Sequence, residues 1–383
     1  MGIRLLALLA VAALVAPALA APCATVGGTT ALDSAARGLG AREWCDFNSN
    51  LTRAMVGGCG GGAPNLTTYA DSMAWDSLNR QVHFEGNRHA GAPRRIVYDE
   101  ASNSWSSWSS YAGSGICSGG YPDCTYNTGG ITDGTRGSCN WHAYDHNTAD
   151  NSGWLYFRPF GARYMRYWNG SSWNSTSSCP TSVCPTSVIT GGIEYFPERN
   201  SVVWIPYLDR IVEWQKASAT WVSLASSPSL AGSYDYALEY NPVHRVMWAM
   251  SGQGATASSK LAANGAVTAL GAAPLGLGVT VALVTVDPVG GYYIVYRKSD
   301  GAWFQYDIIA DTWTTFSTLG ITSMPPLVTG NAQDNIEVSI PDRNVMMFVV
   351  YDAGNSQSKT YLYRHTASTP TVPPAAPTNL RVN

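Results

Sequence analysis

Apolar and polar residues alternate along most of the chain, and this period of two predicts β-strands. Two phrases recur in the pattern. In the first, an aromatic strand end is followed by a short turn and a tryptophan, as at residues 98–105 and 306–313. In the second, two apolar strands flank a turn rich in Pro, Asp or Asn, as at residues 336–349. Their alternation predicts a four-stranded unit that repeats along the chain.

Counting the two phrases gives the number of units. The inner hairpin turns lie at Asp76–Arg80, Asp145–Gly153, Pro197–Asn200, Asn241–Arg245, Asp287–Gly291 and Pro341–Asn344. Outer-strand tryptophans follow at Trp105, Trp173, Trp221 and Trp313, and a tryptophan is missing near Val267. The count predicts an all-β fold, a six-bladed β-propeller, with seven blades as the alternative.

The sixth unit lacks a fourth strand. Its strands at 336–340, 344–351 and 359–364 lead into a tail rich in Thr and Pro. Near the other end of the chain, residues 41–45 resemble an outer strand that has no unit of its own. We therefore expect this N-terminal strand to complete the last blade and close the ring, because closure removes exposed sheet edges.

The two ends of the chain differ from the repeats. Residues 1–20 combine Arg4, an apolar core and small residues before a cleavage site, which predicts a secretory signal peptide. Residues 21–366 form the expected propeller, and residues 367–383 are a Pro-rich tail that resembles the start of a fibronectin type III strand. No later apolar stretch is long enough for a membrane helix. We expect a secreted or periplasmic protein, with no membrane attachment after signal cleavage.

Composition narrows the possible partners. Charged residues make up 13% of the chain, with 23 Lys and Arg against 26 Asp and Glu. This balance argues against nucleic acid, which requires a basic surface. The eight cysteines favour disulfides in an oxidising compartment, with local bridges at 117–124 and 179–184. No cysteine pair has zinc-ligand spacing with a second pair, so we expect no metal site of this kind. We also expect no cofactor and a monomeric protein.

The phrase at residues 98–105 and 306–313 resembles the Tyr-Asp, short turn and Trp of kelch and galactose-oxidase-like propellers. The resemblance covers about residues 41–365 and implies the propeller fold. The kelch diglycine is absent, and residues 84–86 and 205–207 stand in its place. The chain therefore resembles a divergent relative, and the resemblance does not bring a copper oxidase, because no set of Tyr, Cys and two His stands out.

Insertions point to one face of the ring. They fall at residues 45–67 and 109–139, with a smaller one at 174–189, and each joins an outer strand to the next inner strand. All but one of the cysteines lie in or beside these segments. Because disulfides restrict long loops in the unfolded chain, we expect a braced loop face over blades one and two to be the working surface.

Polar residues are expected to meet in a groove between blades one and two. An Arg could neutralise a sugar carboxylate, and a His or Tyr could transfer a proton. The candidate substrate-binding residues are Arg88, Asn140, Trp141, Arg158 and Arg163. The candidate catalytic residues are His89, His142 and Tyr144.

Two other kinds of site find little support. His142 and His146 would lie about 13 Å apart on a strand, too far for one metal ion, and we expect His146 in the inner hairpin turn. A glycosidase needs two placed carboxylates. Glu194 and Glu239, at similar positions in neighbouring inner strands, are the one pair to name, and structural roles are expected for them.

Three functions follow from these observations. The first is a secreted protein that recognises extracellular polysaccharide through the loop face. The second is a polysaccharide lyase, since ulvan lyases are similar in architecture and eliminate across uronate-containing chains. In that case Arg158 or Arg163 with Asn140 would neutralise the carboxylate, His142 or His89 would remove the proton, and Tyr144 would protonate the leaving oxygen. The third is a protein-interaction propeller. Whether the protein is an enzyme stays open at this point.

Overall fold

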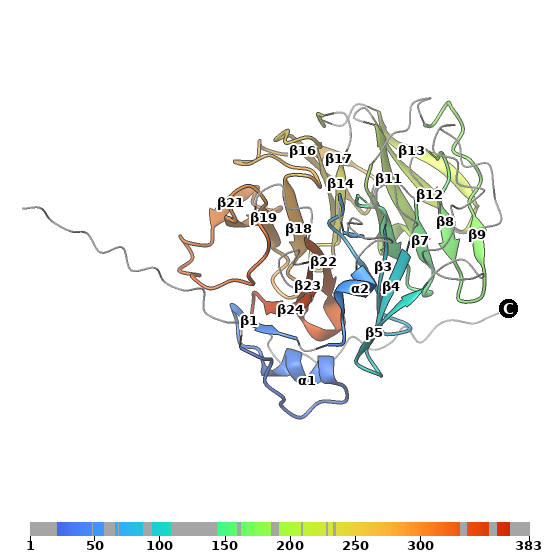
Figure 1. Cartoon of the computed structure of the whole chain (residues 1–383). Coiled ribbons are helices and arrows are strands. Elements are labelled where there is room, and N and C mark those ends of the chain that lie inside the picture. Colours follow the sequence, from blue (N-terminus) through green and yellow to red (C-terminus); the bar gives the residue numbers. More distant parts are fainter. Residues whose placement is uncertain are drawn as a thin grey trace, which may run out of the picture.

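Six four-stranded antiparallel sheets form a ring in the computed structural model of the chain (Figure 1). The inner strand of each sheet contacts the inner strands of both neighbours, so the ring is closed. The prediction of a six-bladed β-propeller is confirmed. The structure describes residues 21–47, 49–56, 66–67, 69–86, 94–108, 144–158, 162–184, 191–207, 210–226, 229–232, 235–329, 335–351 and 358–367.

The blades follow chain order. Blade one is β2 (Ala74–Asp76), β3 (Gln81–Gly86), β4 (Arg94–Asp99) and β5 (Ser104–Trp108); blade two is β6 (Asn147–Ala149), β7 (Leu155–Phe157), β8 (Arg166–Trp168) and β9 (Trp173–Ser175); blade three is β10 (Ile193–Phe196), β11 (Ser201–Tyr207), β12 (Arg210–Gln215) and β13 (Thr220–Ser226). Blade four is β14 (Ala237–Asn241), β15 (Val246–Met250), β16 (Ser258–Ala262) and β17 (Val267–Ala269); blade five is β18 (Ala282–Val286), β19 (Tyr293–Arg297), β20 (Trp303–Asp307) and β21 (Thr312–Thr315); blade six is β22 (Asn335–Ile340), β23 (Val345–Val350), β24 (Lys359–Arg364) and β1 (Glu43–Asp46).

The tryptophan phrase is a cross-strand aromatic pair. Tyr306 of β20 lies opposite Trp313 of β21, and their rings stack with centroids 4.5 Å apart. Asp307 shapes the turn between them, because its Oδ1 accepts hydrogen bonds from the backbone N–H groups of Ile309 and Ala310 at 2.9 and 3.0 Å. Such pairs are a unit of sheet stabilisation, and the Asp side chain replaces a backbone partner in the turn. The repeated phrase therefore reflects interactions within a single hairpin.

The second phrase is a tight turn that ends in a left-handed residue. Pro341–Arg343 forms a short 3-10 helix, and Asn344 follows with φ 56°. The same arrangement occurs at Pro197–Arg199, where Asn200 has φ 47°. Proline sets the backbone angle at the start of such a turn, and asparagine tolerates positive φ better than most residues. This chemistry explains why the two inner hairpins could be predicted.

The N-terminal strand closes the ring, as predicted. Strand β1 pairs antiparallel with β24, so that Trp44 lies opposite Tyr363, and Figure 1 shows the blue strand beside the red one. Trp44 Nε1 also donates to Ser323 Oγ at 2.9 Å. A disulfide between Cys23 and Cys45 ties the preceding segment to this strand. The join between the two ends of the chain is therefore both hydrogen-bonded and covalently braced.

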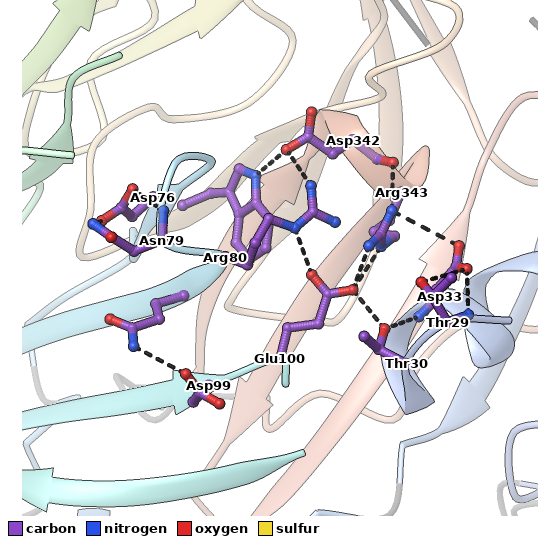
Figure 2. Close-up of polar contacts among 12 residues, drawn as sticks. Thr29, Thr30, Asp33, Asp76, Asn79, Arg80, Asp99, Glu100, Asp342 and Arg343 are labelled. Carbon is purple, nitrogen blue, oxygen red and sulfur yellow. Dashed lines mark hydrogen bonds and ion pairs between the residues drawn. The ribbon is translucent and has the colours of Figure 1, made fainter. Parts of the chain in front are cut away.

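A cluster of charges holds the join from the side of the inner hairpin turns (Figure 2). Glu100, which is buried, accepts hydrogen bonds from Arg80 Nε at 2.9 Å and from Arg343 Nη2 at 2.6 Å. Thr30, at the start of helix α1 (Ala31–Gly38), donates to the same carboxylate at 2.6 Å. Arg80 continues to Asp342 at 3.0 Å. Blade one, blade six and the N-terminal helix thus share one set of polar contacts.

Two sequence expectations need correction. The sequence indicated no helix after the signal segment, yet α1 forms and a very short helix α2 (Arg53–Val56) follows. The Thr30 hydroxyl caps α1 by accepting from Asp33 N at 3.1 Å, a local signal that strand-period counting overlooks. His146 does not lie in the inner hairpin turn of blade two, because strand β6 occupies the middle of the predicted turn and His146 precedes it.

The cysteines divide between two uses. Cys179 and Cys184 form the expected local bridge. Cys45, which was assigned to the braced loops, instead bonds to Cys23 and holds the closing strand. Cys59, Cys117, Cys124 and Cys139 lie outside the described residues. In the described part of the chain, no helix is long and apolar enough to cross a membrane.

Replacing Cys23 and Cys45 by alanine should destabilise the protein by about 3 kcal/mol, since the bridge closes a loop with a sequence separation of 22. The Cys179→Ala, Cys184→Ala variant is the matched control. Its bridge spans a separation of only 5, and we expect a smaller loss of about 2 kcal/mol. Denaturant unfolding of both variants measures the difference. An equal or smaller loss for the Cys23 and Cys45 variant would contradict a special role in ring closure.

Candidate functional site

Carboxylates from five of the six blades gather around the axis of the ring. They come from the inner strands or from the residues immediately before them, where each chain segment passes the axis. The five are Asp71 and Asp145, before β2 and β6, and Glu194, Glu239 and Glu337, in β10, β14 and β22. Blade five contributes Thr285 in β18 at the corresponding level. The propeller therefore has an acidic axial channel.

Some of these carboxylates have partners inside the channel. Asp145 Oδ1 accepts from Ser72 Oγ at 2.6 Å, and Asp145 Oδ2 accepts from Leu238 N of blade four. Glu194 Oε1 accepts from Thr148 Oγ1 at 3.2 Å. These contacts join blade two to blades one, four and three, so they hold the inner segments of these blades together.

Glu337 differs from the others. Its side chain is fully buried, and neither of its carboxylate oxygens has a hydrogen-bond partner among the described residues. The Thr285 hydroxyl lies near enough to lower the pKa of Glu337, but the two groups do not meet hydrogen-bond geometry. Asp71 Oδ1 is unpartnered in the same part of the structure. A buried carboxylate without a partner is unfavourable, so a ligand or proton is expected to satisfy it.

Burial shifts the protonation of the whole group. It raises the pKa of Glu194 to about 8. It raises the pKa of Glu239 and of Glu337 well above the usual range, with repulsion between these two charges adding to the effect for Glu239. The pKa of Asp71 rises for the same reasons, burial first and then the neighbouring Asp145. At neutral pH the channel therefore holds protonated carboxyl groups, which can both donate and accept hydrogen bonds.

The channel opens into a cavity of about 320 Å³. The cavity lies toward the face formed by the turns between the first and second strands of the blades. We use the name channel mouth for this cavity, whose lining includes Trp75, Tyr195, Tyr240, Glu194, Glu239 and Glu337. It combines aromatic rings and carboxyl groups on five inner strands, a mixture typical of small-ligand sites.

The aromatic rim of the channel mouth is held in place. Trp75 Nε1 donates to Asp342 Oδ2 at 3.0 Å, and the guanidinium carbon of Arg80 lies 5.3 Å from the Trp75 ring centroid. Across the mouth, Tyr240 donates its hydroxyl proton to Glu198 at 3.0 Å. Because its own polar group is already bonded, the Trp75 ring can present an apolar surface to a ligand without rearrangement.

The described part of the predicted groove lies in the interior. Arg158 is fully buried, its Nη2 lies 2.9 Å from His146 Nε2, and its guanidinium carbon is 5.2 Å from the Trp204 ring centroid. Burial lowers the pKa of Arg158 to about 9. Tyr144 is also buried and lies beside His146, with ring centroids 5.7 Å apart. The structure thus brings Tyr144 and Arg158 together around His146.

The other predicted residues separate from this cluster or fall outside the description. Arg163 donates to the backbone oxygen of Cys184 at 2.9 Å and so braces the disulfide loop of blade two. Arg88, His89, Asn140, Trp141 and His142 lie outside the described residues. Their roles, and the roles of Tyr144, Arg158 and Arg163 in binding or catalysis, stay predictions.

Sequence reasoning named only two of the five channel carboxylates and assigned them structural roles. Glu194 and Glu239 begin the same phrase, Glu-Tyr-x-Pro, in residues 194–197 and 239–242. Repetition of a charged residue in an inner strand of a propeller is the signal that pointed to the axis. Asp71, Asp145 and Glu337 have no such shared phrase, and only the fold brings them to the same place.

No protein-family model and no curated protein matches this chain. Among solved structures it is similar to a structural-genomics protein of unknown function from Bacteroides thetaiotaomicron, with a TM-score of 0.51 and 12% identity over 83% of this chain and 75% of the other. It is also similar to virginiamycin B lyase from Staphylococcus aureus, with a TM-score of 0.46 and 12% identity over 77% and 85% of the two chains. At these identities the likeness concerns the fold alone.

Stability should fall as the pH rises from about 6.5 to about 8. The folded-state pKa of Glu194, about 8, exceeds the ordinary value of 4.5, so the folded state holds a proton that the unfolded state has lost. We expect a loss of about 1.4 kcal/mol, the free energy of one pKa unit, and a smaller loss in Glu194→Gln. His83 and His365, whose pKa values burial lowers, contribute in the opposite direction near pH 6.5, where unfolded histidine is half protonated. The comparison with Glu194→Gln removes their contribution, because both proteins share it.

The measurement is the free energy of unfolding in denaturant at both pH values. Glu43→Gln, which removes an exposed carboxylate from β1, is the control and should keep the wild-type pH dependence. A wild-type protein that gains stability over this range would contradict a protonated Glu194 in the folded state.

Proposed function

We propose that this protein is an exported recognition propeller that binds extracellular polysaccharide at the channel mouth. One observation carries the proposal: a cavity of about 320 Å³ is lined jointly by carboxyl groups, hydroxyls and aromatic rings from five blades. Sugars present hydroxyl groups on their edges and C–H surfaces on their faces. Carboxyl groups pair with the first, and rings such as Trp75 and Tyr240 cover the second.

Export is part of the same proposal. The disulfides Cys23–Cys45 and Cys179–Cys184 indicate an oxidising, extracellular compartment. The predicted signal segment, residues 1–20, lies outside the described residues. A secreted or periplasmic protein of this kind would meet polysaccharides of cell surfaces or of the surroundings.

The acidic lining bears on the sugar class. Five carboxyl groups converge at the axis, so the negative charge of a uronate would repel any of them that ionises, and none of them could neutralise it. The lyase hypothesis assigns carboxylate neutralisation to Arg158 or Arg163, and the first is fully buried while the second is bonded to a backbone oxygen. No contact among the described residues favours elimination. The predicted loop face over blades one and two remains a second surface to test.

Binding should depend on Trp75. We expect the purified protein to bind at least one neutral or basic polysaccharide on a glycan array, and Trp75→Ala to weaken that binding about tenfold or more. Leu78→Ala is the control, because Leu78 belongs to the same hairpin turn and is 61% exposed. The absence of binding to every glycan would refute the proposal. An equal loss of affinity in both variants would show that binding does not occur at the channel mouth.

Incubation with uronate polysaccharides should give no unsaturated product, as followed by the ultraviolet absorbance that β-elimination creates. The physical reason is that no Lys or Arg lines the channel mouth in the described part of the chain. A rise in absorbance that His142→Ala abolishes would instead support the lyase hypothesis and the loop-face groove.

A further inference from the structure

The five channel carboxylates favour a cationic ligand, and the cavity favours an ammonium group over a metal ion. We propose that the ligand at the channel mouth carries an ammonium group and that the polysaccharide is therefore rich in amino sugars. This inference rests on the proposed function and names its substrate class.

The first observation is the unsatisfied state of Glu337. Both of its carboxylate oxygens lack a hydrogen-bond partner among the described residues, although the side chain is fully buried and lines the cavity. Asp71 Oδ1 adds a third unpartnered oxygen nearby, and Glu337 N donates to Asp71 O at 2.7 Å across the join of blades one and six. Unpartnered buried acceptors require a donor, and an ammonium group supplies three.

The second observation is the spacing of the carboxylates. Among the described residues, no three His, Cys, Asp or Glu side chains lie close enough together to hold a metal ion. Metal–oxygen bonds require donors to converge at about 2.0 to 2.6 Å from one point. An ammonium group bonds at about 2.8 Å, and the organic body that carries it can contact the aromatic rings that line the cavity.

The third observation is the balance of charge in the channel. The titratable groups that face it are Asp71, Asp145, Glu194, Glu239, Glu337, Asp235 and Lys298. Lys298 Nζ donates to the backbone oxygens of Val279 and Ala70, at 2.6 and 3.4 Å, and so lies at the end of the channel where Asp71 and Asp235 are found. One lysine cannot balance six carboxyl groups, so the carboxyl groups at the mouth can still pair with a cation.

The rim suits the rest of an amino sugar. Trp75, Tyr195 and Tyr240 surround the mouth, and aromatic faces attract a cation as well as the C–H face of a sugar ring. The ammonium group would thus sit among Glu194, Glu239 and Glu337 while the ring lies against the aromatic rim. Neighbouring residues of the chain would extend along the face formed by the hairpin turns.

The test compares three oligosaccharides that differ only at the second carbon of each residue: chitosan oligomers with an amine, chitin oligomers with an acetamide, and cello-oligomers with a hydroxyl. Isothermal titration should show at least tenfold tighter binding of the amine. It should also show proton release, because the cation displaces protons from the carboxyl groups. In buffers of different ionisation enthalpy, this release changes the observed heat.

Three variants test whether the preference for the amine arises in the channel. Glu337→Gln and Glu239→Gln should each reduce the preference for the amine at least tenfold, whereas Glu43→Gln, on the exposed edge strand, should leave it unchanged. Glu239 lies at the accessible mouth, so its variant tests the proposal even if replacement of Glu337 prevents folding. Circular dichroism confirms that each variant is folded.

The outcomes separate the two proposals. Equal binding of the three oligomers would overturn the ammonium inference and leave the proposed polysaccharide function standing. The absence of binding to these oligomers and to every other glycan would overturn both proposals. Binding of oligolysine, with no binding of chitosan oligomers, would also overturn the inference, because the cation would then belong to a peptide.

Discussion

The pairing of β1 with β24 is the interaction on which the rest of the structure depends. Blade six has only three strands from its own part of the chain, and β1 supplies the fourth from more than three hundred residues away in sequence. At the neighbouring contact between blades six and one, Glu337 N donates to the backbone oxygen of Asp71, which precedes β2. If the ring opened there, the acidic channel would lose its geometry. The disulfide at Cys45 and the contacts of Glu100 both stabilise the closed ring.

Closure has an electrostatic cost. The ring directs five carboxylates to one axis, where burial and mutual repulsion disfavour their charged forms. Packing between the blades offsets this cost. Trp248 of blade four, for example, is fully buried against Tyr293, Tyr306 and Trp313 of blade five. A fold that keeps an unfavourable group of charges at its axis has a place where a cationic ligand would gain affinity, and this links stability to the proposed recognition.

Much of the architecture could be predicted because its signals are local. Asn344 adopts positive φ within one turn, and Tyr306 meets Trp313 across a single hairpin, so neither feature depends on distant parts of the chain. The errors arose where distant contacts decide. Cys45 finds its partner at Cys23 rather than in the loops. Helix α1 was missed for a different reason, because its Thr30 cap is a local signal that a count of strand periods does not include. The burial of Arg158 against Trp204 was likewise beyond local signals, and its role in binding stays a prediction.

The sequence by itself determined the class of fold, the number of blades and the way the ring closes, because strand alternation and turn chemistry act over a few residues and repeat along the chain. Only the tertiary structure decided where chemistry is concentrated. Glu337 and Asp71 are far apart in sequence, and nothing local marks them as neighbours. Their proximity, and the shifted pKa values that result, come from the curvature of the whole ring, which directs the inner strands of all six blades to a common axis.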